Sequence, residues 1–148
     1  MPILFSSATG YALRVLSVLP ASKGFVRASD LAERLGIPGF YLSKILQTLT
    51  RAGILESFKG PTGGFRLARP AAEVRVRDVM QALEGANPLD TCILGVVGCR
   101  AETPCPMHVA WHRVRPHIDR QMLHMTIAEL QRQRRRGRRT LAPGGQPA

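Results

Sequence analysis

Apolar residues recur near the helical period at the start of the chain and predict a first helix over residues 7–19. Its inward stripe consists of Ala8, Ala12, Val15, Leu16 and Leu19. Ser7 or Thr9 is the expected cap, since a hydroxyl can accept a hydrogen bond from a free backbone N–H. Pro20 ends the helix, because proline lacks the N–H that another turn would need.

Two more helices are predicted next, joined by a short glycine-containing turn. Ser29 is the expected N-cap of the first, and Gly36 ends it. Pro38 suits the first turn of the second, and Gly53 ends that helix. Its buried stripe consists of Leu42, Ile45, Leu46 and Leu49, at positions i, i+3, i+4 and i+7. Such a pair is the helix-turn-helix layout, in which the second helix enters the major groove of DNA.

The other face of this second helix is polar and carries two cations and no acid. It consists of Tyr41, Ser43, Lys44, Gln47, Thr48 and Arg51. We expect Lys44 and Arg51 to contact phosphates or bases, and Tyr41 and Ser43 to lie near the base edges. A helical hairpin with no role in DNA binding has the same local pattern. The segment that follows is therefore needed to support DNA binding.

That segment predicts a β-hairpin, with a strand over 54–58, a turn over 59–64 and a return over 65–67. A hairpin directly after a recognition helix is typical of a wing. Gly60, Gly63 and Gly64 would let the tip turn tightly and approach a phosphate, with Lys59 and Arg66 beside them. The alternative is a plain hairpin with incidental charge.

The second half predicts a short helix over 76–84 and a turn-rich segment without a regular period. A long helix follows over about 107–124, with a kink or break at Pro116. Trp111 in this helix is expected to pack at a dimer contact. Thr126 and Glu129 form a capping-box pattern that would start a last short helix.

Composition and charge add a class of partner. The chain has 148 residues, 45% of them apolar, and a mean hydropathy near zero, as in an ordinary soluble protein. Its 21 basic and 10 acidic residues give a net charge of +11; without the six arginines in residues 132–139 the balance is 15 to 10. This favours a polyanionic partner, although a charge of +5 also suits a merely soluble surface.

A cytoplasmic location, with no membrane association, is expected. The apolar start lacks the basic region and the cleavage pattern of a signal peptide, and no uncharged run approaches the roughly 20 residues that span a bilayer. In the cytoplasm thiols stay reduced, and clustered cysteines more often bind metal than form disulfides.

All three cysteines, Cys92, Cys99 and Cys105, lie in the turn-rich segment. An odd number cannot pair fully in internal disulfides, so a shared metal or iron–sulfur cluster is the natural common partner. Thiolates are the usual ligands of iron–sulfur clusters, and the C-x6-C-x5-C loop can wrap three of them round one cluster.

Three segments together make the chain resemble the IscR/NsrR/RirA family of winged-helix iron–sulfur transcription regulators, over roughly residues 5–130. They are IPGFYLSKILQTLTRAGIL (37–55), KGPTGGFRLARP (59–70) and CILGVVGCRAETPCPMH (92–108). The resemblance implies a homodimer held by the long helix, with the cysteine loop next to the dimer interface and the wings outward.

A three-cysteine site needs a fourth ligand, and His108 is the first candidate because CPMH resembles the family members that use a histidine there. Other members take a carboxylate or histidine from the partner's first helix, but residues 1–29 here contain no Asp, Glu, His or Cys. His112, one helical turn further, is the second candidate, and an exogenous ligand or a weak oxygen donor is the remaining alternative. The cluster type, 2Fe–2S or 4Fe–4S, stays open.

The expected fold is mainly α with a small β wing, a winged helix-turn-helix domain followed by a long dimerisation helix. The expected regions are a DNA-binding domain (1–85), a cysteine-bearing cluster loop (86–106), the dimerisation helix with a short C-terminal helix (107–131) and a basic, disordered tail (132–148). The expected function is a homodimeric transcription regulator, a repressor, that senses redox state or nitric oxide through its cluster. It would bind double-stranded DNA at a two-fold symmetric operator whose half-sites lie roughly 34 Å apart.

Other readings remain open from the residues alone. Cys3His is also a good structural zinc site, and three reactive thiols could sense oxidants without metal. A small iron–sulfur electron carrier and a nucleic-acid chaperone driven by the arginine tail are further alternatives. An enzyme is not expected, since the sequence has no nucleophile–base pair, no carboxylate pair and no phosphate-binding fingerprint.

Overall fold

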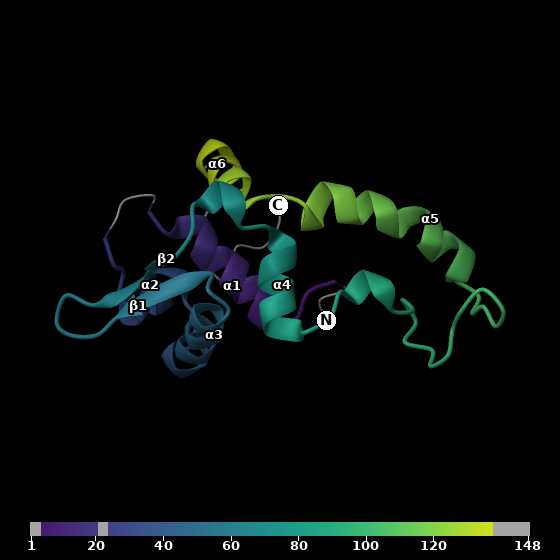
Figure 1. The fold of residues 1–148 in the computed structure, drawn as a ribbon, viewed down its shortest axis with the longest axis horizontal. Helices are drawn as coiled ribbons and strands as arrows, with labels where there is room; N and C mark the ends of the chain where they lie inside the picture. Colours follow the sequence, from purple (N-terminus) through teal and green to yellow (C-terminus); the bar gives the residue numbers. More distant parts are fainter. Residues whose placement is uncertain (1–3, 21–23, 138–148) are drawn as a thin grey trace.

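The computed structural model describes residues 4–20 and 24–137 and is mainly helical, with one two-stranded sheet (Figure 1). The helices are α1 (Ser7–Val18), α2 (Ala28–Leu35), α3 (Gly39–Arg51), α4 (Val76–Glu84), α5 (His108–Ile118) and α6 (Ile127–Gly137). The strands are β1 (Leu55–Phe58) and β2 (Gly64–Leu67), and the short 3-10 helices are η1 (Ala71–Glu73) and η2 (Pro88–Asp90). In the described residues, no helix is long and apolar enough to cross a membrane.

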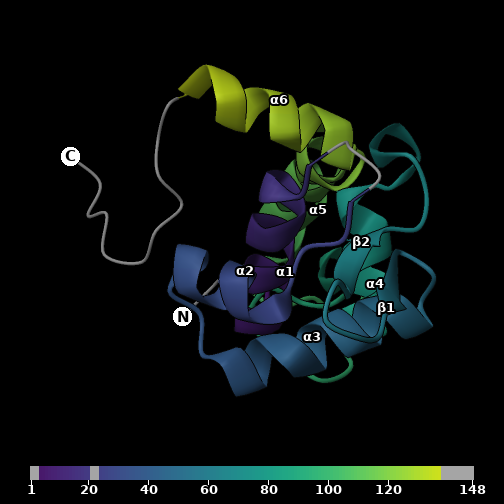
Figure 2. The ribbon, with the colours of Figure 1, turned by 90° about the vertical axis from the view of Figure 1, so that its left-hand side faces the viewer.

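The main core confirms the predicted apolar stripes of α1 and α3. All four stripe residues of α3 are buried, and so are four of the five in α1, Ala8 being half-buried. The core also takes in α2, the first residue of β1, α4 and the start of α6. In Figure 2, α6 lies on one side of α1 and α3 on the other. We call α1–α4, the hairpin and α6 together the body.

Helix starts differ from the prediction at three places. Pro38 is the N-cap of α3 and not a residue of its first turn, because the helix starts at Gly39. The N-cap of α1 is Ser6, whose hydroxyl accepts a hydrogen bond from the Thr9 N–H, so the prediction of Ser7 or Thr9 was wrong by at least one residue. The N-cap of α2 is Arg27, and no side chain caps this helix. Ser29 is its second residue, so the prediction of Ser29 as the N-cap was wrong. The predicted stop at Gly36 is confirmed, with φ of 61°.

The hairpin is an antiparallel pair in which Leu55 lies opposite Leu67 and Phe58 opposite Gly64. A third segment joins it, because Val26 and Phe65 exchange backbone hydrogen bonds of 2.9 and 2.8 Å. The hairpin is therefore attached to the residues that lead into α2.

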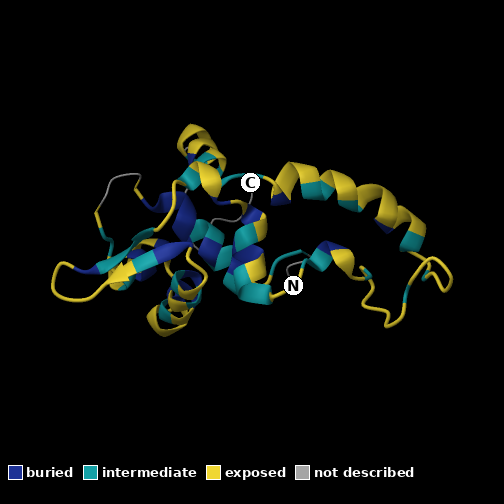
Figure 3. Cartoon of the chain, in the orientation of Figure 1, coloured by how far each residue is buried: buried dark blue, intermediate teal, exposed yellow. Residues whose placement is uncertain are grey.

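The long helix is interrupted, but not where the sequence predicted. α5 continues through Pro116 to Ile118, and a π-turn occupies Asp119–Leu123. Pro116 therefore lies inside the helix, at an exposed position. Most of α5 is exposed (Figure 3). We call residues 86–118, which comprise the cysteine loop (86–106) and α5, the arm.

A small second core connects the arm to the body. It consists of Val76, Met80, Leu89, Trp111 and Leu123. The prediction that Trp111 packs at a dimer contact was wrong, since its side chain is buried within its own chain.

The capping box before α6 is confirmed. Thr126 N–H donates to the Glu129 carboxylate (2.9 Å), and Glu129 N–H donates to the Thr126 hydroxyl (3.1 Å). α6 then extends to Gly137, so the prediction of a disordered tail from residue 132 was wrong for 132–137. Its first part is attached to α1, because the Gln131 and Arg134 side chains donate hydrogen bonds to carbonyls at the end of that helix. Residues 138–148 lie outside the described part of the chain.

Gln131 is a test of how α6 is held. Its Nε2 donates to the carbonyls of Leu16 (2.9 Å) and Leu19 (3.1 Å), at a helix end that lacks backbone donors. Gln131→Leu should lower the free energy of unfolding by about 1–3 kcal/mol, because buried carbonyls lose their partner. Urea unfolding followed by circular dichroism measures this free energy.

Gln133→Leu, at an exposed position on the same helix, is the control and should change the free energy of unfolding by less than about 0.5 kcal/mol. Equal effects of the two changes would contradict the account.

Candidate functional site

Two glycines in left-handed conformation fold the cysteine loop back on itself. Gly95 (φ 69°) and Gly98 (φ 76°) occupy a backbone region that residues with a Cβ rarely enter. Gly95 N–H donates to the Cys92 carbonyl (2.9 Å), and Cys99 N–H donates to the Val96 carbonyl (3.3 Å). These consecutive turns bring Cys99 back toward Cys92.

The three thiols meet at one point next to the start of α5. Their Sγ atoms all lie within 4.8 Å of one another, and none is in a disulfide. The Sγ atoms of Cys92 and Cys105 are 3.4 Å apart. Cys99 Sγ lies 3.3 Å from Nδ1 of His108, the first residue of α5. The four residues singled out in the sequence therefore come together, with His108 in contact through Cys99.

The thiols differ in acidity. The pKa of Cys92 is lowered to about 7, because the backbone N–H groups of Val96 and Leu94 stabilise its thiolate more than desolvation opposes it. The pKa of Cys105 is raised by desolvation and by its hydrogen bond with Cys92. Of these two thiols, Cys92 is therefore the more acidic.

A second histidine stands beside this group. The rings of His108 and His112 stack with centroids 4.2 Å apart. Desolvation, with further contributions from the charges of Arg115 and His108, lowers the pKa of His112. Its imidazole is therefore neutral at pH 7, the form that binds metals.

Long side chains of α5 attach the helix to the segment before Cys92. Trp111 Nε1 donates to the Thr91 carbonyl (2.9 Å), and Arg115 donates to the Leu89 carbonyl (3.1 Å). A small cavity of about 30 Å³ lies among these groups. It is lined by Asp90, Thr91, Cys92, Ile93, Cys99, Cys105, His108, Trp111, His112 and Arg115. Sequence reasoning missed both anchors, since contacts across 20 or more residues leave no local pattern.

The polar face of α3 is where the sequence placed it. Tyr41, Lys44, Gln47 and Arg51 are exposed and Ser43 is half-buried. Tyr41 also packs edge-on against Tyr11 of α1, with ring centroids 5.6 Å apart. Phe40 was missed, although it is 78% exposed and lies under the Lys44 ammonium, 4.5 Å from its ring centroid. Its place outside the buried stripe of α3 was the signal for its exposure.

The three glycines of the wing differ in their surroundings. A Cβ at Gly63 would lie 2.1 Å from the Phe58 carbonyl oxygen, and one at Gly64 would lie 2.3 Å from the Val26 oxygen. Packing of the hairpin therefore requires both glycines, whatever else they contact. Gly60, with φ of 115° and open space around it, is the glycine at the free tip, next to exposed Lys59.

Two arginines stabilise the wing, Arg27 from the residue before α2 and Arg66 from within β2. Arg27 donates to the Pro61 carbonyl at the tip (2.6 Å). Arg66 forms an ion pair with Glu56 and lies 4.3 Å from the centroid of the Phe25 ring. Arg66 thus has a structural role that the sequence reading as a phosphate contact did not foresee.

The thiols and the wing lie at opposite ends of the chain. Figure 1 shows the wing at one end of the long axis and the cysteine loop at the other, with α4 between them. Within a protomer, the cysteine loop contacts the body through the chain that follows α4, through the second core and through α5.

Alkylation tests the thiol electrostatics. In the reduced, metal-free protein, Cys92 should react with iodoacetamide fastest at pH 7, with a rate that rises through a midpoint near pH 7 as its thiolate forms. Cys105 should react more slowly, because its pKa is raised. Peptide mapping by mass spectrometry against pH measures both rates. In Cys92→Ser, no thiol should show an alkylation rate that rises with a midpoint near pH 7. If such a rate remained, another thiol would be the acidic one.

Comparison with known proteins gives the same fold and a family. The family model Rrf2, described as an iron-dependent transcriptional regulator, matches residues 5–133. The IscR transcriptional regulator of Photobacterium profundum is 32% identical over 114 residues, covering 77% of this chain and 66% of that protein. A putative HTH-type transcriptional regulator of Aquifex aeolicus is 29% identical over 131 residues, covering 86% of this chain and 91% of that protein.

Solved structures agree on the fold. T. potens IscR has a TM-score of 0.70 and 24% identity, covering 90% of each chain. CymR, the global cysteine regulator of B. subtilis, has a TM-score of 0.72 and 20% identity, covering 87% of this chain and 96% of that one. The winged-helix fold and the match along residues 5–133 lead to one conclusion: the chain belongs to the Rrf2 family of transcription regulators.

Proposed function

We propose that this protein is a homodimeric repressor whose binding to a two-fold symmetric operator is switched by an iron–sulfur cluster. Cys92, Cys99, Cys105 and His108 are the proposed ligands. The observation that carries the proposal is the convergence of three free thiols within 4.8 Å on a chain of a transcription-regulator family.

The donor set fits such a group. Three thiolates are the preferred ligands of iron–sulfur clusters, and a histidine nitrogen is a known fourth ligand type. The low pKa of Cys92 supplies one thiolate near neutral pH. His108 stands at the N-terminus of α5, where the helix dipole also favours the anionic form of neighbouring thiols. A bound cluster would supply a centre that oxidants or nitric oxide can alter.

His108 is preferred over other fourth ligands. Its Nδ1 already lies 3.3 Å from one thiol, whereas His112 stands one turn further along α5. Residues 1–29 offer no Asp, Glu, His or Cys for donation across a dimer. His112 is well placed to orient the His108 ring by stacking.

The exposed faces of α3 and the wing form the proposed DNA interface. Lys44 and Arg51 would bind phosphates or bases, Ser43, Gln47 and Tyr41 would lie near base edges, and Lys59 with Gly60 would enter the flanking groove. Gly63 and Gly64 would serve this interface by fixing the shape of the wing. Two copies related by a two-fold axis would read half-sites about 34 Å apart.

The arm offers the surface for dimerisation. Apolar side chains stand exposed along it and on the adjacent π-turn, at Met107, Val109, Val114 and Met122. Large apolar groups gathered on one exposed helix are typical of a protein interface. Pairing through this helix places the two cysteine loops close to the interface, so a change in loop order alters the spacing of the two recognition helices.

Metal analysis is the test of the ligand set. Protein purified without oxygen should be brown and contain iron and acid-labile sulfide, and Cys92→Ser, Cys99→Ser or Cys105→Ser should lose most of both. His108→Ala should keep the fold but show an altered visible spectrum or lower iron content, while His117→Ala on the exposed side of α5 should match wild type. Colourless protein with one zinc per chain would refute the cluster and leave a structural zinc site. Colourless protein without metal would leave a thiol sensor.

DNA binding tests the interface. We expect Arg51→Ala and Lys44→Ala to weaken binding to a selected operator about tenfold each, and Lys59→Ala to reduce the slope of log affinity against log salt by about 1. The duplex is enriched from a randomised library with cluster-loaded and cluster-free protein in parallel. Arg136→Ala on α6, across α1 from α3, is the matched control and should leave affinity unchanged (Figure 2). A larger loss of DNA affinity in Arg136→Ala than in Arg51→Ala would show that DNA binds on the side of α6, and would contradict the proposed interface.

A further inference from the structure

The chain after the π-turn is fixed to the start of α4 by backbone hydrogen bonds. Val76 N–H donates to the Met125 carbonyl (2.9 Å), and Ile127 N–H donates to the Val74 carbonyl (2.8 Å). Residues 74–76 and 125–127 therefore run side by side as a short antiparallel pair. The chain returns from the arm to the body immediately before residues 125–127.

The five-residue π-turn Asp119–Leu123 separates this fixed pair from α5. His124 N–H donates across it to the Asp119 carbonyl (3.1 Å), an i→i+5 bond. The π-turn follows α5 directly and ends this helical stretch, and π-helical turns are frequent at functional sites. Leu123 within the turn is buried in the second core, whereas Asp119 is only partly buried.

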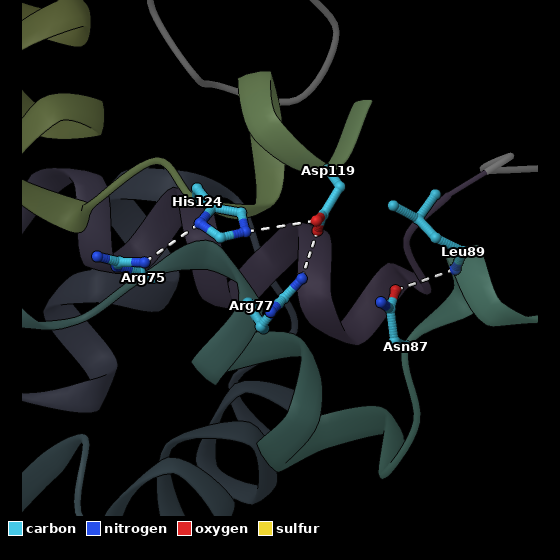
Figure 4. Close-up of polar contacts among 6 residues, drawn as sticks. All are labelled: Arg75, Arg77, Asn87, Leu89, Asp119 and His124. Carbon is cyan, nitrogen blue, oxygen red and sulfur yellow. Dashed lines mark hydrogen bonds and ion pairs between the residues drawn. The ribbon is translucent and has the colours of Figure 1, made fainter. Parts of the chain in front are cut away.

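The Asp119 carboxylate ties the two sides of this turn to α4. One oxygen forms an ion pair with Arg77 of α4, and the other lies 3.3 Å from Nε2 of His124 (Figure 4). Nδ1 of His124 in turn lies 3.2 Å from Arg75, the N-cap of α4. We call Asp119, His124, Arg75 and Arg77 the joint. Apolar contacts are nondirectional, whereas these polar contacts specify an angle between α5 and α4.

A cavity lies beside the joint. Its volume is about 230 Å³, and it lies between the arm and α4. It is lined by Arg77, Asn87, Leu89, Asp90, Arg115, Pro116 and Asp119. Within the arm, Trp111 and Arg115 bind the segment next to Cys92 to α5, so the thiols and this helix move together.

We propose that Asp119 is the positioning residue that transmits the state of the cysteine site to the DNA-binding body, by holding α5 at one angle to α4 through Arg77 and His124. This inference rests on the proposed cluster-switched function. A change at the thiols shifts α5, and the Asp119–Arg77 pair converts that shift into a change of the recognition helix relative to its partner copy. Loss of the pair leaves both sites intact and uncouples them.

The test compares operator affinity of the cluster-loaded and cluster-free forms, each as the full dimer, in wild type and in Asp119→Asn. Asparagine keeps the shape and loses the charge. The ratio of the two affinities should fall about three- to fivefold toward one, while iron content and visible spectrum stay as in wild type. Glu102→Gln is the matched control, since it removes another exposed ion pair of the arm, with Arg100 at 3.9 Å, outside the joint.

Arg77→Gln gives an independent variant on the other side of the pair and should lower the ratio by no more than Asp119→Asn does, because Asp119 also contacts His124. The double variant should lower the ratio no further than Asp119→Asn alone, because that change already removes the pair with Arg77. Hydrogen exchange of the metal-free protein adds a readout without DNA: the His124 amide should exchange faster in Asp119→Asn and not in Glu102→Gln.

The outcomes separate this inference from the function on which it rests. A wild-type ratio of one would overturn the switch itself. A wild-type ratio far from one that Asp119→Asn and Arg77→Gln leave unchanged would overturn the role of the joint alone, as would an equal fall in Glu102→Gln.

Discussion

The second core is the contact on which the rest of the structure depends. Val76 and Met80 come from α4, Leu89 and Trp111 from the arm, and Leu123 from the π-turn, and all five side chains are buried. Each such side chain contributes about 1.5–3 kcal/mol when fully buried. Without this core the thiols would be attached to the body only through two short stretches of chain. With it, the cysteine loop, α5 and α4 form one continuous path.

That path explains how sites at opposite ends of a small chain can act together. The main core fixes α1, α3 and α4 into one unit, so the recognition helix follows α4. The arm carries the thiols and the exposed apolar residues, so the same element holds the proposed sensor and the proposed dimer contact. The proposed coupling between ligand and DNA requires an element with two arrangements, and the π-turn is the element we propose for it.

The sequence predicted most of the body because its helices are strongly periodic and end at glycines. The stripe of α3, the stop at Gly36 and the bounds of α4 all follow from local rules. The cap of α1 was misplaced by one residue, since neighbouring Ser6 and Ser7 offer the same hydroxyl. The joint, the Trp111 anchor and the steric need for Gly64 depend on contacts between distant segments, which no local pattern reports. The helical residues 132–137 were missed because arginine-rich sequence resembles a solvated tail, whereas Arg134 bonds the Ser17 carbonyl.

The central claim is that the cysteine site and the DNA-binding surface share one conformational equilibrium. The most direct measurement is the affinity of the wild-type dimer for one selected operator, with the cluster loaded and with it removed, at the same salt concentration and without oxygen. The account predicts affinities that differ by about fivefold or more, the usual range of a coupling between two sites. Equal affinities of the two forms would contradict it.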